Sequence, residues 1–375
     1  PTRATVIGII LSSDKTQLAN FRSNSTAWPV YMSIANIHKD FRRKINNRAM
    51  VLLGYLPTAK LREIEHTTDR AIRLHDLFHH CMTHLLQELR TLGAEGIMMV
   101  CPDKKLRHIY PVVVSYIADH PEQCLVVGCR QNRCPLCLVN WKERSQPLVG
   151  APRQMNVYSY FRETSESLRE YYNRCSLAGM VAITQPFWEQ LLHCDIFSSI
   201  TPDILHELHK GLFGDHLRDW LAEVIGYGQL DHCYRSMLPH DNLIHFPQGI
   251  MYLDKITGTE YKNMEKTFCG AIGGLTPHHL QHPTRALIDM IYLSQLPLHT
   301  TSTLNKLQAC WEEFHAHKEV FVEYFACKNF NFPKMHKPNH HISSIQSRGT
   351  LDNFSTELLE HLHISLAKDA YRAGN

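Results

Sequence analysis

The chain has 375 residues, of which 44% are apolar and 20% charged, so it holds enough core material for two or three structural units. No stretch is apolar for the length of a membrane helix and no secretory signal is recognisable, which argues against membrane and secreted classes. The net charge of +3 is mildly basic and points only weakly to a nucleic-acid partner, while twelve cysteines predict reduced thiols, some on metal. The two ends read as those of a piece cut from a longer protein.

Five short runs of apolar and β-branched residues predict strands. They cover residues 5–11, 28–37, 48–57, 97–103 and 109–119. Between the third and fourth runs, residues 68–92 carry apolar side chains at steps of three and four, which predicts a helix that ends before Gly93.

Beyond residue 158 the pattern is mostly helical, and a last helix is predicted over residues 354–372. A polar segment with Pro147, Gly150 and Pro152 marks a boundary. We therefore expect a first part of the core over residues 1–145, a mostly α-helical insertion over residues 146–350, and a return to the core over residues 351–375.

The order strand, strand, strand, helix, strand predicts an α/β fold with a ribonuclease-H-like core and a mixed sheet. Two of its predicted strands end in an aspartate, Asp14 and Asp119. In such a core the ends of the first and fourth strands lie side by side, so the two carboxylates are expected to share metal ions. The simpler interpretation of each aspartate is a turn or helix-capping residue.

A third acid is expected from the last helix, where Glu357 and Glu360 are three residues apart and can share one face. We favour Glu360, because the first-turn position of Glu357 suits capping. Such a set of carboxylates suits two Mg²⁺ ions, or Mn²⁺, that contact one scissile phosphate. The alternative is that both glutamates only complement the helix dipole.

Cysteine and histidine spacing predicts a second metal site. Cys134 and Cys137 form a CxxC on a tight turn, and His206 and His209 lie three apart in a predicted helix. Two thiolates and two imidazoles would form a closed structural zinc site, with Cys129 as a spare ligand. Buried thiols and surface histidines are the alternative.

Several segments together carry a resemblance to a known family. They are IILSSDKTQLANFRSNSTAWPVYMSIANIHKDFRRK, RAMVLLGYLPTAKL, YIADHPEQCLVVGCRQNRCPLC, HCDIFSSITPDILHELHKGLFGDHLRDW and STELLEHLHISLAKDAYRAGN. In this order they resemble the Plavaka transposases of fungal genomes, relatives of the CACTA-type cut-and-paste elements, over essentially the whole chain.

This resemblance implies a ribonuclease-H-like transposase whose first two catalytic acids are Asp14 and Asp119. It implies Mg²⁺ and structural Zn²⁺ as cofactors, transposon ends and target DNA as partners, a homo-oligomeric synaptic complex, no membrane, and action in the nucleus. Asp203 and His206 match a D-x-x-H string of related transposases. Two positions depart from the family pattern, since His361 follows Glu360 where arginine is usual, and Ser365 stands in LHIS where LHID is usual.

The leading hypothesis from the sequence is a DDE-type DNA transposase. In it, Lys15 and the basic run Arg42–Lys44 would contact phosphates, and Lys368 would lie near bound DNA. A catalytically inactive, transposon-derived DNA-binding protein remains an alternative, as does a ribonuclease-H-type nuclease that acts on hybrids.

Overall fold

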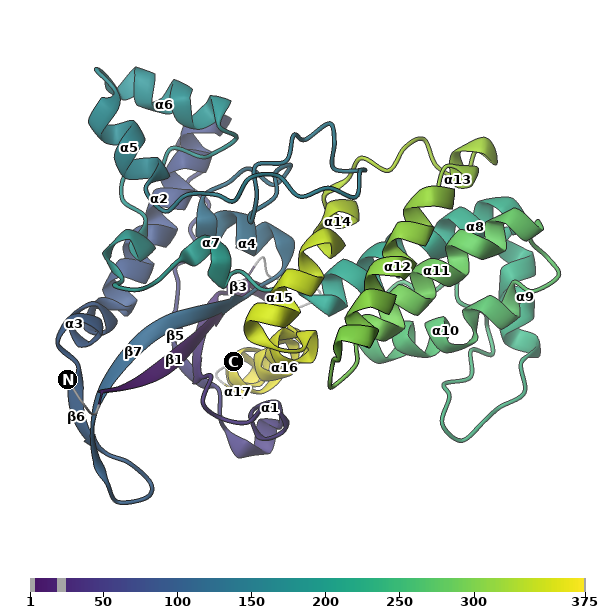
Figure 1. The fold of residues 1–375 in the computed structure, drawn as a ribbon, viewed down its shortest axis with the longest axis horizontal. Coiled ribbons are helices and arrows are strands. Elements are labelled where there is room, and N and C mark those ends of the chain that lie inside the picture. Colours follow the sequence, from purple (N-terminus) through teal and green to yellow (C-terminus); the bar gives the residue numbers. More distant parts are fainter. Residues whose placement is uncertain (1–3, 19–24, 374–375) are drawn as a thin grey trace. The chain divides into compact units, whose positions relative to one another are not determined.

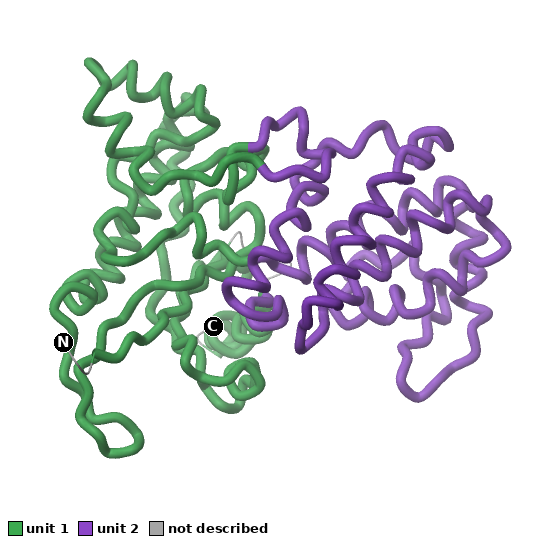
Figure 2. The backbone as a smooth tube through the Cα atoms, viewed as in Figure 1, with its two compact units in different colours: residues 1–138, 150–201, 356–375 green, residues 139–149, 202–355 purple. Residues whose placement is uncertain are grey.

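The computed structural model describes residues 4–18 and 25–373, which divide into two compact units (Figure 2). The sheet unit comprises Pro1–Leu138, Gly150–Thr201 and Thr356–Asn375, and the helical unit comprises Val139–Val149 and Pro202–Ser355. The sequence-based boundary at residue 145 differs from this division, because residues 150–201 group with the sheet. Tyr158 shows why: it is fully buried, with its hydroxyl 2.8 Å from the carbonyl oxygens of both Gly128 and Val181.

All five predicted strands are present in one mixed sheet with the order β5-β4-β1-β7-β6. Its strands are β1 (Ala4–Ser13), β4 (Pro29–Ile34), β5 (Val51–Tyr55), β6 (Ile97–Val100) and β7 (Leu106–Ile117). β1 pairs in parallel with β7 and antiparallel with β4, and the β4–β5 and β6–β7 pairs are antiparallel. A separate two-stranded sheet consists of β2 (Thr16–Gln17) and β3 (Thr26–Ala27). The first three strands of the main sheet thus form a meander, with β7 beside β1 (Figure 1).

The register of β1 depends on a close approach at Gly8. A Cβ at this position would lie 2.9 Å from Val114 Cγ2 and 3.0 Å from Ala35 Cβ, so only glycine fits without a shift. The pairing of β1 with β7 shifts by one residue just beyond, because Ile9 pairs with Val113 but Ile10 pairs with Ser115. The bulge lets both strands continue to the same sheet edge.

Helices cover the sheet unit. They are α1 (Lys39–Arg42), α2 (Thr67–Leu85), α3 (Gln87–Glu95), α4 (His120–Val127), α5 (Val157–Thr164), α6 (Leu168–Leu177), α7 (Ile196–Ser199), α16 (Glu357–Leu362) and α17 (Asp369–Ala373), with a π-helical segment His363–Lys368 and 3₁₀ turns Ile45–Asn47 and Phe187–Gln190. The helix predicted over residues 68–92 is divided into α2 and α3 at Leu86, and it continues through Gly93 to Glu95, because the glycine with positive φ that ends it is Gly96. The predicted last helix starts at Glu357. The core of this unit contains stacked and edge-on aromatic rings, among them Trp28, Phe78 and Phe187.

The helical unit is an all-helical assembly around a second apolar core. It contains a π-helical segment Leu205–Leu217, α8 (Arg218–Ile225), α9 (Tyr227–Ser236), α10 (Gly258–Ala271), α11 (His278–Ser294), α12 (Thr301–His317), α13 (Val320–Glu323), α14 (Pro333–His336), α15 (His341–Arg348), and 3₁₀ turns Lys337–His340 and Leu351–Phe354. α11 and α12 run side by side (Figure 1). Phe213, Phe268 and Phe314 are fully buried in the core, which explains the dense apolar pattern of these segments. No described helix combines the length and the apolarity needed to cross a membrane.

Candidate active site and metal-binding cluster

Asp14 and Asp119 emerge from neighbouring parallel strands at the same edge of the sheet. The last registered pair of β1 and β7 joins Ser12 to Ile117, so each aspartate stands two residues beyond that pair. Side chains alternate between the two faces of a strand, so two residues at the same distance beyond a registered pair are expected to point to the same side of the sheet. Both are partly exposed, as metal ligands at the mouth of a site need to be. The predicted adjacency of the two strands is thus present in the structure.

Asp119 also has the capping role that the simpler interpretation gave it. It is the N-cap of α4, and its Oδ1 accepts a hydrogen bond from the backbone N–H of Glu122 at 3.0 Å. Capping and metal binding are compatible, because an ionised carboxylate offers two oxygens and about four acceptor positions. The cap fixes the side-chain orientation of Asp119 at the sheet edge.

Glu122 is a third carboxylate at this edge, and the sequence analysis missed it. It is only 7% exposed, and its Oε1 accepts hydrogen bonds from the Trp28 indole at 2.8 Å and from the Ser13 hydroxyl. Burial raises the pKa of Glu122, the two hydrogen bonds oppose the rise, and the charges of Asp14 and Asp119 add to it, so that the pKa lies at about 7. In the sequence, Glu122 has the signature of an ordinary first-turn acid. Its partners on the first strand and on Trp28 become visible only in the fold.

The end of the chain reaches Asp14 through His363. This histidine is buried, stacks on Tyr31 with ring centroids 5.8 Å apart, and places Nδ1 3.9 Å from Asp14 Oδ2. Burial lowers its pKa to about 4, and the nearby charge of Lys368 acts in the same direction. Tyr55 strengthens the docking of this segment, because its hydroxyl donates to the carbonyl of Leu366 at 2.7 Å. The last helical segment therefore packs where the sequence analysis expected a third acid.

The two candidate glutamates differ in their position on that segment. Glu360 is exposed and lies one turn before His363, on a neighbouring part of the same helix face, whereas Glu357 is partly buried in the first turn of α16. Within residues 4–18 and 25–373, a group of ligand atoms that all lie within 4.8 Å of one another is formed by other side chains.

The basic residues expected to contact phosphates have different surroundings. Arg42 is buried and donates to the carbonyl of Ile37 at 3.0 Å, so its guanidinium stabilises the turn around α1. Lys15 is exposed, with its ammonium 4.3 Å from the centroid of the Trp28 ring. Lys15 therefore stays a candidate phosphate contact, and Arg42 is better explained as a structural residue.

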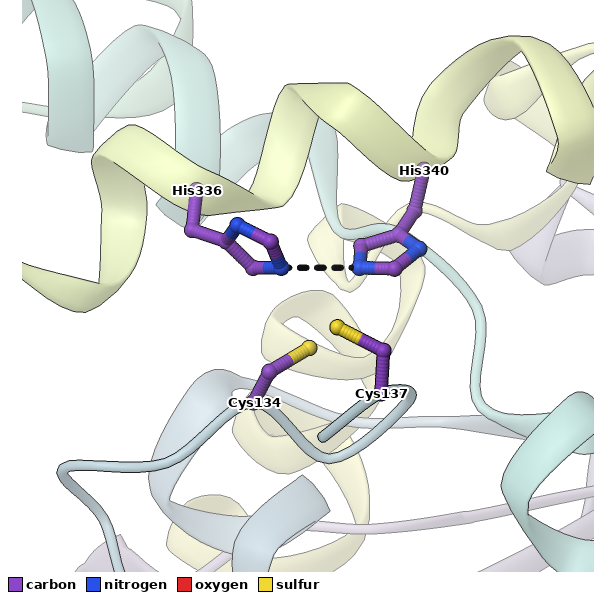
Figure 3. Close-up of side chains that lie close together, drawn as sticks. All are labelled: Cys134, Cys137, His336 and His340. Carbon is purple, nitrogen blue, oxygen red and sulfur yellow. Dashed lines mark hydrogen bonds between the residues drawn. The ribbon is translucent and has the colours of Figure 1, made fainter. Parts of the chain in front are cut away.

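The second candidate centre is a buried group of two cysteines and two histidines. Cys134, Cys137, His336 and His340 each offer one ligand atom, and these atoms all lie within 4.8 Å of one another (Figure 3). A tetrahedral zinc ion with bonds of about 2.1–2.3 Å would hold its ligands roughly 3.5–4 Å apart, so small side-chain movements suffice. The backbone N–H of Leu136 lies 3.4 Å from Cys134 Sγ, an orientation that stabilises a thiolate. The cluster has the donor set and the burial of a structural zinc site and could bind that metal.

The polypeptide around the histidines holds them in place. The amide nitrogen of Asn339 lies 3.4 Å from His336 Nδ1. The amide oxygen of Asn339 accepts a 2.6 Å hydrogen bond from the indole N–H of Trp311. The same amide nitrogen donates to the carbonyls of Gln146 and Leu148, in the segment that closely follows the cysteine turn. Partners of this kind orient metal-binding imidazoles in many proteins.

The histidine half of this cluster is a correction to the sequence analysis. The predicted ligands His206 and His209 are engaged elsewhere: His206 Nδ1 lies 2.6 Å from Asp203 Oδ2, and His209 Nδ1 lies 2.8 Å from the buried carboxylate of Glu265. His336 and His340 have a helical four-residue spacing that the sequence does show. They were missed because the local run is rich in histidine and nothing in it points to the cysteines.

Comparison with known protein families agrees with the resemblance described above. A family model described as Plavaka transposase matches residues 1–221. This range contains Asp14, Asp119 and Glu122 as well as the cysteine pair, whereas the last helical segment and His336 and His340 lie beyond it. No curated protein matches the chain.

Proposed function

The chain belongs to the Plavaka transposase family, and from this membership and the geometry of the sheet edge we propose that it is a DDE-type DNA transposase. The proposed activity is metal-dependent cleavage and strand transfer of a cut-and-paste transposon. One observation carries it: Asp14 and Asp119 follow paired parallel strands at equal offsets from the last registered pair.

We assign the sheet to the ribonuclease-H-like class. The support is its order, in which an antiparallel meander of β1, β4 and β5 is followed by helices and by β7 in parallel with β1. On this assignment the helical unit is an insertion into the core, because the chain returns to the sheet unit at Thr356.

In the proposed mechanism, Asp14, Asp119 and Glu360 would hold two Mg²⁺ ions, for which Mn²⁺ could substitute. Bound there, the ions would supply charge stabilisation for the attacking and the leaving oxygen of the scissile phosphate. The strand-end backbone and the α4 cap orient the two aspartates, and His363 packs beside Asp14. Water attacks first and frees a 3′-hydroxyl at the element end, and this hydroxyl then attacks target DNA. No covalent enzyme intermediate is needed.

A strand-transfer assay on DNA with the element's terminal inverted repeats tests this function. Asp14→Asn and Asp119→Asn should each abolish metal-dependent nicking while binding of the same DNA persists. Asp69→Asn is the matched control, because Asp69 is an exposed first-turn acid of α2. Wild-type protein that binds these ends and never nicks them would contradict the proposal.

The third acid is tested by the same assay with Glu360→Gln and Glu357→Gln. We expect the Glu360 variant to lose cleavage and the Glu357 variant to retain it. The opposite result moves the assignment by one helical turn, and full activity in both variants contradicts a third acid in this helix.

A catalytically inactive DNA-binding protein is the second candidate function. The observation in its favour is that the last helical segment meets Asp14 through the buried His363, while Glu360 is exposed. This candidate predicts that wild type and Asp14→Asn bind DNA equally well and that neither cleaves it.

We also propose that zinc occupies the group formed by Cys134, Cys137, His336 and His340, with a structural role. Cys134→Ser should then lower zinc content and thermal stability together. Cys129→Ser, at another buried cysteine, should keep the metal. Retention of zinc in the Cys134 variant would contradict this site.

A further inference from the structure

A cavity of about 440 Å³ lies in the sheet unit next to the carboxylate edge. Three of its lining residues come from the two segments that carry the aspartates: Lys15 follows Asp14, and Pro121 and Glu122 follow Asp119. Its volume is within the range of small-molecule sites, which is about 300–1,000 Å³. A group bound in this cavity would therefore sit beside any phosphate held at the sheet edge.

The walls of the cavity suit a flat, aromatic ligand. Trp28 and Phe78 both line it, with their rings stacked at 5.4 Å between centroids and 25° between planes. The remaining walls are mainly aliphatic and include Leu74, Leu77 and Val181. Nucleobases bind to such surfaces through stacking that tolerates any sequence.

Polar groups in the cavity are few. The Nδ1 atom of His75 is buried, has no hydrogen-bond partner among the described residues, and belongs to a residue that lines the cavity. An unpartnered buried nitrogen is costly unless a ligand supplies a hydrogen bond. The edge of a nucleobase offers both donors and acceptors for this purpose.

Two exposed cationic residues, Lys15 and Arg130, also line the cavity. The ammonium group of Lys15 lies over the Trp28 ring. Exposed cations next to a stacking surface are the combination with which proteins bind single-stranded nucleic acid, because the charges follow the phosphates while the bases stack.

From these observations we propose that the cavity receives one unpaired nucleobase of the DNA strand whose phosphate lies at Asp14 and Asp119. This inference rests on the proposed function, which supplies the DNA. Withdrawing a base from the stack next to the reacting phosphate would fix the strand in register and favour DNA already unpaired at that position.

Photo-crosslinking tests the proposal directly. The probe is a single-stranded oligothymidylate with one 5-iododeoxyuridine, bound to the full chain with Ca²⁺ in place of Mg²⁺. Irradiation should attach the iodouracil to Trp28 or Phe78, and mass spectrometry locates the adduct. Adducts confined to exposed aromatic residues such as Trp141 and Tyr160 would overturn the proposal.

A blocking substitution provides the quantitative test. Ala71 is exposed in α2 and lines the cavity, so Ala71→Leu narrows it with little risk to folding, and Ala94→Leu, at an exposed alanine of α3 outside the lining, is the matched control. Base stacking is worth about 1–3 kcal/mol, so loss of stacking should weaken oligothymidylate binding by roughly 5- to 140-fold in the Ala71 variant only. Equal affinity of both variants would overturn the proposal.

The cleavage assay keeps the two claims apart. Active wild-type enzyme whose probe crosslinks elsewhere, and whose Ala71→Leu variant binds normally, contradicts the base pocket and leaves the transposase assignment intact. An adduct at Trp28 with weakened binding in Ala71→Leu, but without metal-dependent cleavage, supports the pocket and contradicts the enzyme.

Discussion

The carboxylate edge and the cysteine–histidine cluster are built in different ways. At the edge, backbone pairing does the positioning: β1 and β7 are in register, so Asp14 and Asp119 reach the same edge. In the cluster, a cysteine turn and a helical segment from a distant part of the chain bring their side chains together. Ligands placed by strand register can therefore be inferred from a local sequence pattern, whereas ligands contributed by a distant helix to the cluster could not be.

The largest effect expected from breaking the first arrangement is on catalysis. Asp14→Asn keeps the shape of the side chain and removes the charge that binds metal, so strand cleavage should fall by roughly 1,000-fold or more, equivalent to several kcal/mol of transition-state stabilisation. Single-turnover cleavage of pre-bound DNA measures this effect without a contribution from binding. A loss of less than tenfold would mean that the strand-end geometry does not serve catalysis.

Features encoded in neighbouring residues could be predicted from the sequence, and features that depend on tertiary contacts could not. The five strands, the two aspartates and the cysteine pair were all visible as local patterns of alternation, strand ends and spacing. Glu122 and His363 were not, because their importance comes from burial and from contacts with Trp28 and Asp14 that only the fold creates. The two histidines of the cluster could not be predicted for a related reason, because spacing alone does not single out one pair among 26 histidines.

The second prediction concerns the removal of one histidine ligand from the cysteine–histidine cluster. His340→Ala should reduce bound zinc to background and lower the melting temperature, because three ligands bind the ion far more weakly than four and the bound metal stabilises the folded state. His206→Ala removes the originally expected ligand and should keep its zinc. Elemental analysis of the purified proteins measures both outcomes. Zinc lost from the His206 variant and retained in the His340 variant would restore the first assignment.

The third prediction concerns Glu122, whose folded-state pKa of about 7 lies above its ordinary 4.5. Between these values an unfolded chain ionises this carboxyl while the folded protein keeps it protonated, so the folded state loses stability as pH rises through the window. The pKa difference corresponds to roughly 3 kcal/mol.

Glu122→Gln stays neutral and keeps an acceptor for the Trp28 indole, so its stability should be nearly constant over this window. Urea denaturation at pH 4.5 to 8 without divalent cations measures the difference from wild type. The matched control is Glu88→Gln, at an exposed first-turn acid of α3. A constant difference between Glu122→Gln and wild type at all pH values would show that the carboxyl has the same pKa in the folded and the unfolded chain, which contradicts the raised pKa.

The smallest effects are expected on the free energy of unfolding when a glycine is replaced by alanine, once in the sheet unit and once in the helical unit. At Gly8 a new Cβ would meet Val114 Cγ2 at 2.9 Å, so Gly8→Ala should destabilise the strand register by about 1–3 kcal/mol. At Gly270 in α10 nothing lies within 4 Å of a new Cβ, so Gly270→Ala should stabilise its helix by about 0.5–1 kcal/mol. Adding Val114→Ala to the Gly8 variant removes the obstructing methyl and should recover part of the loss, as measured by chemical denaturation. If Gly8→Ala instead matches wild type in stability and cleavage, the strand register does not depend on this close approach, and the tight pairing of β1 with β7 loses its role in positioning the two aspartates.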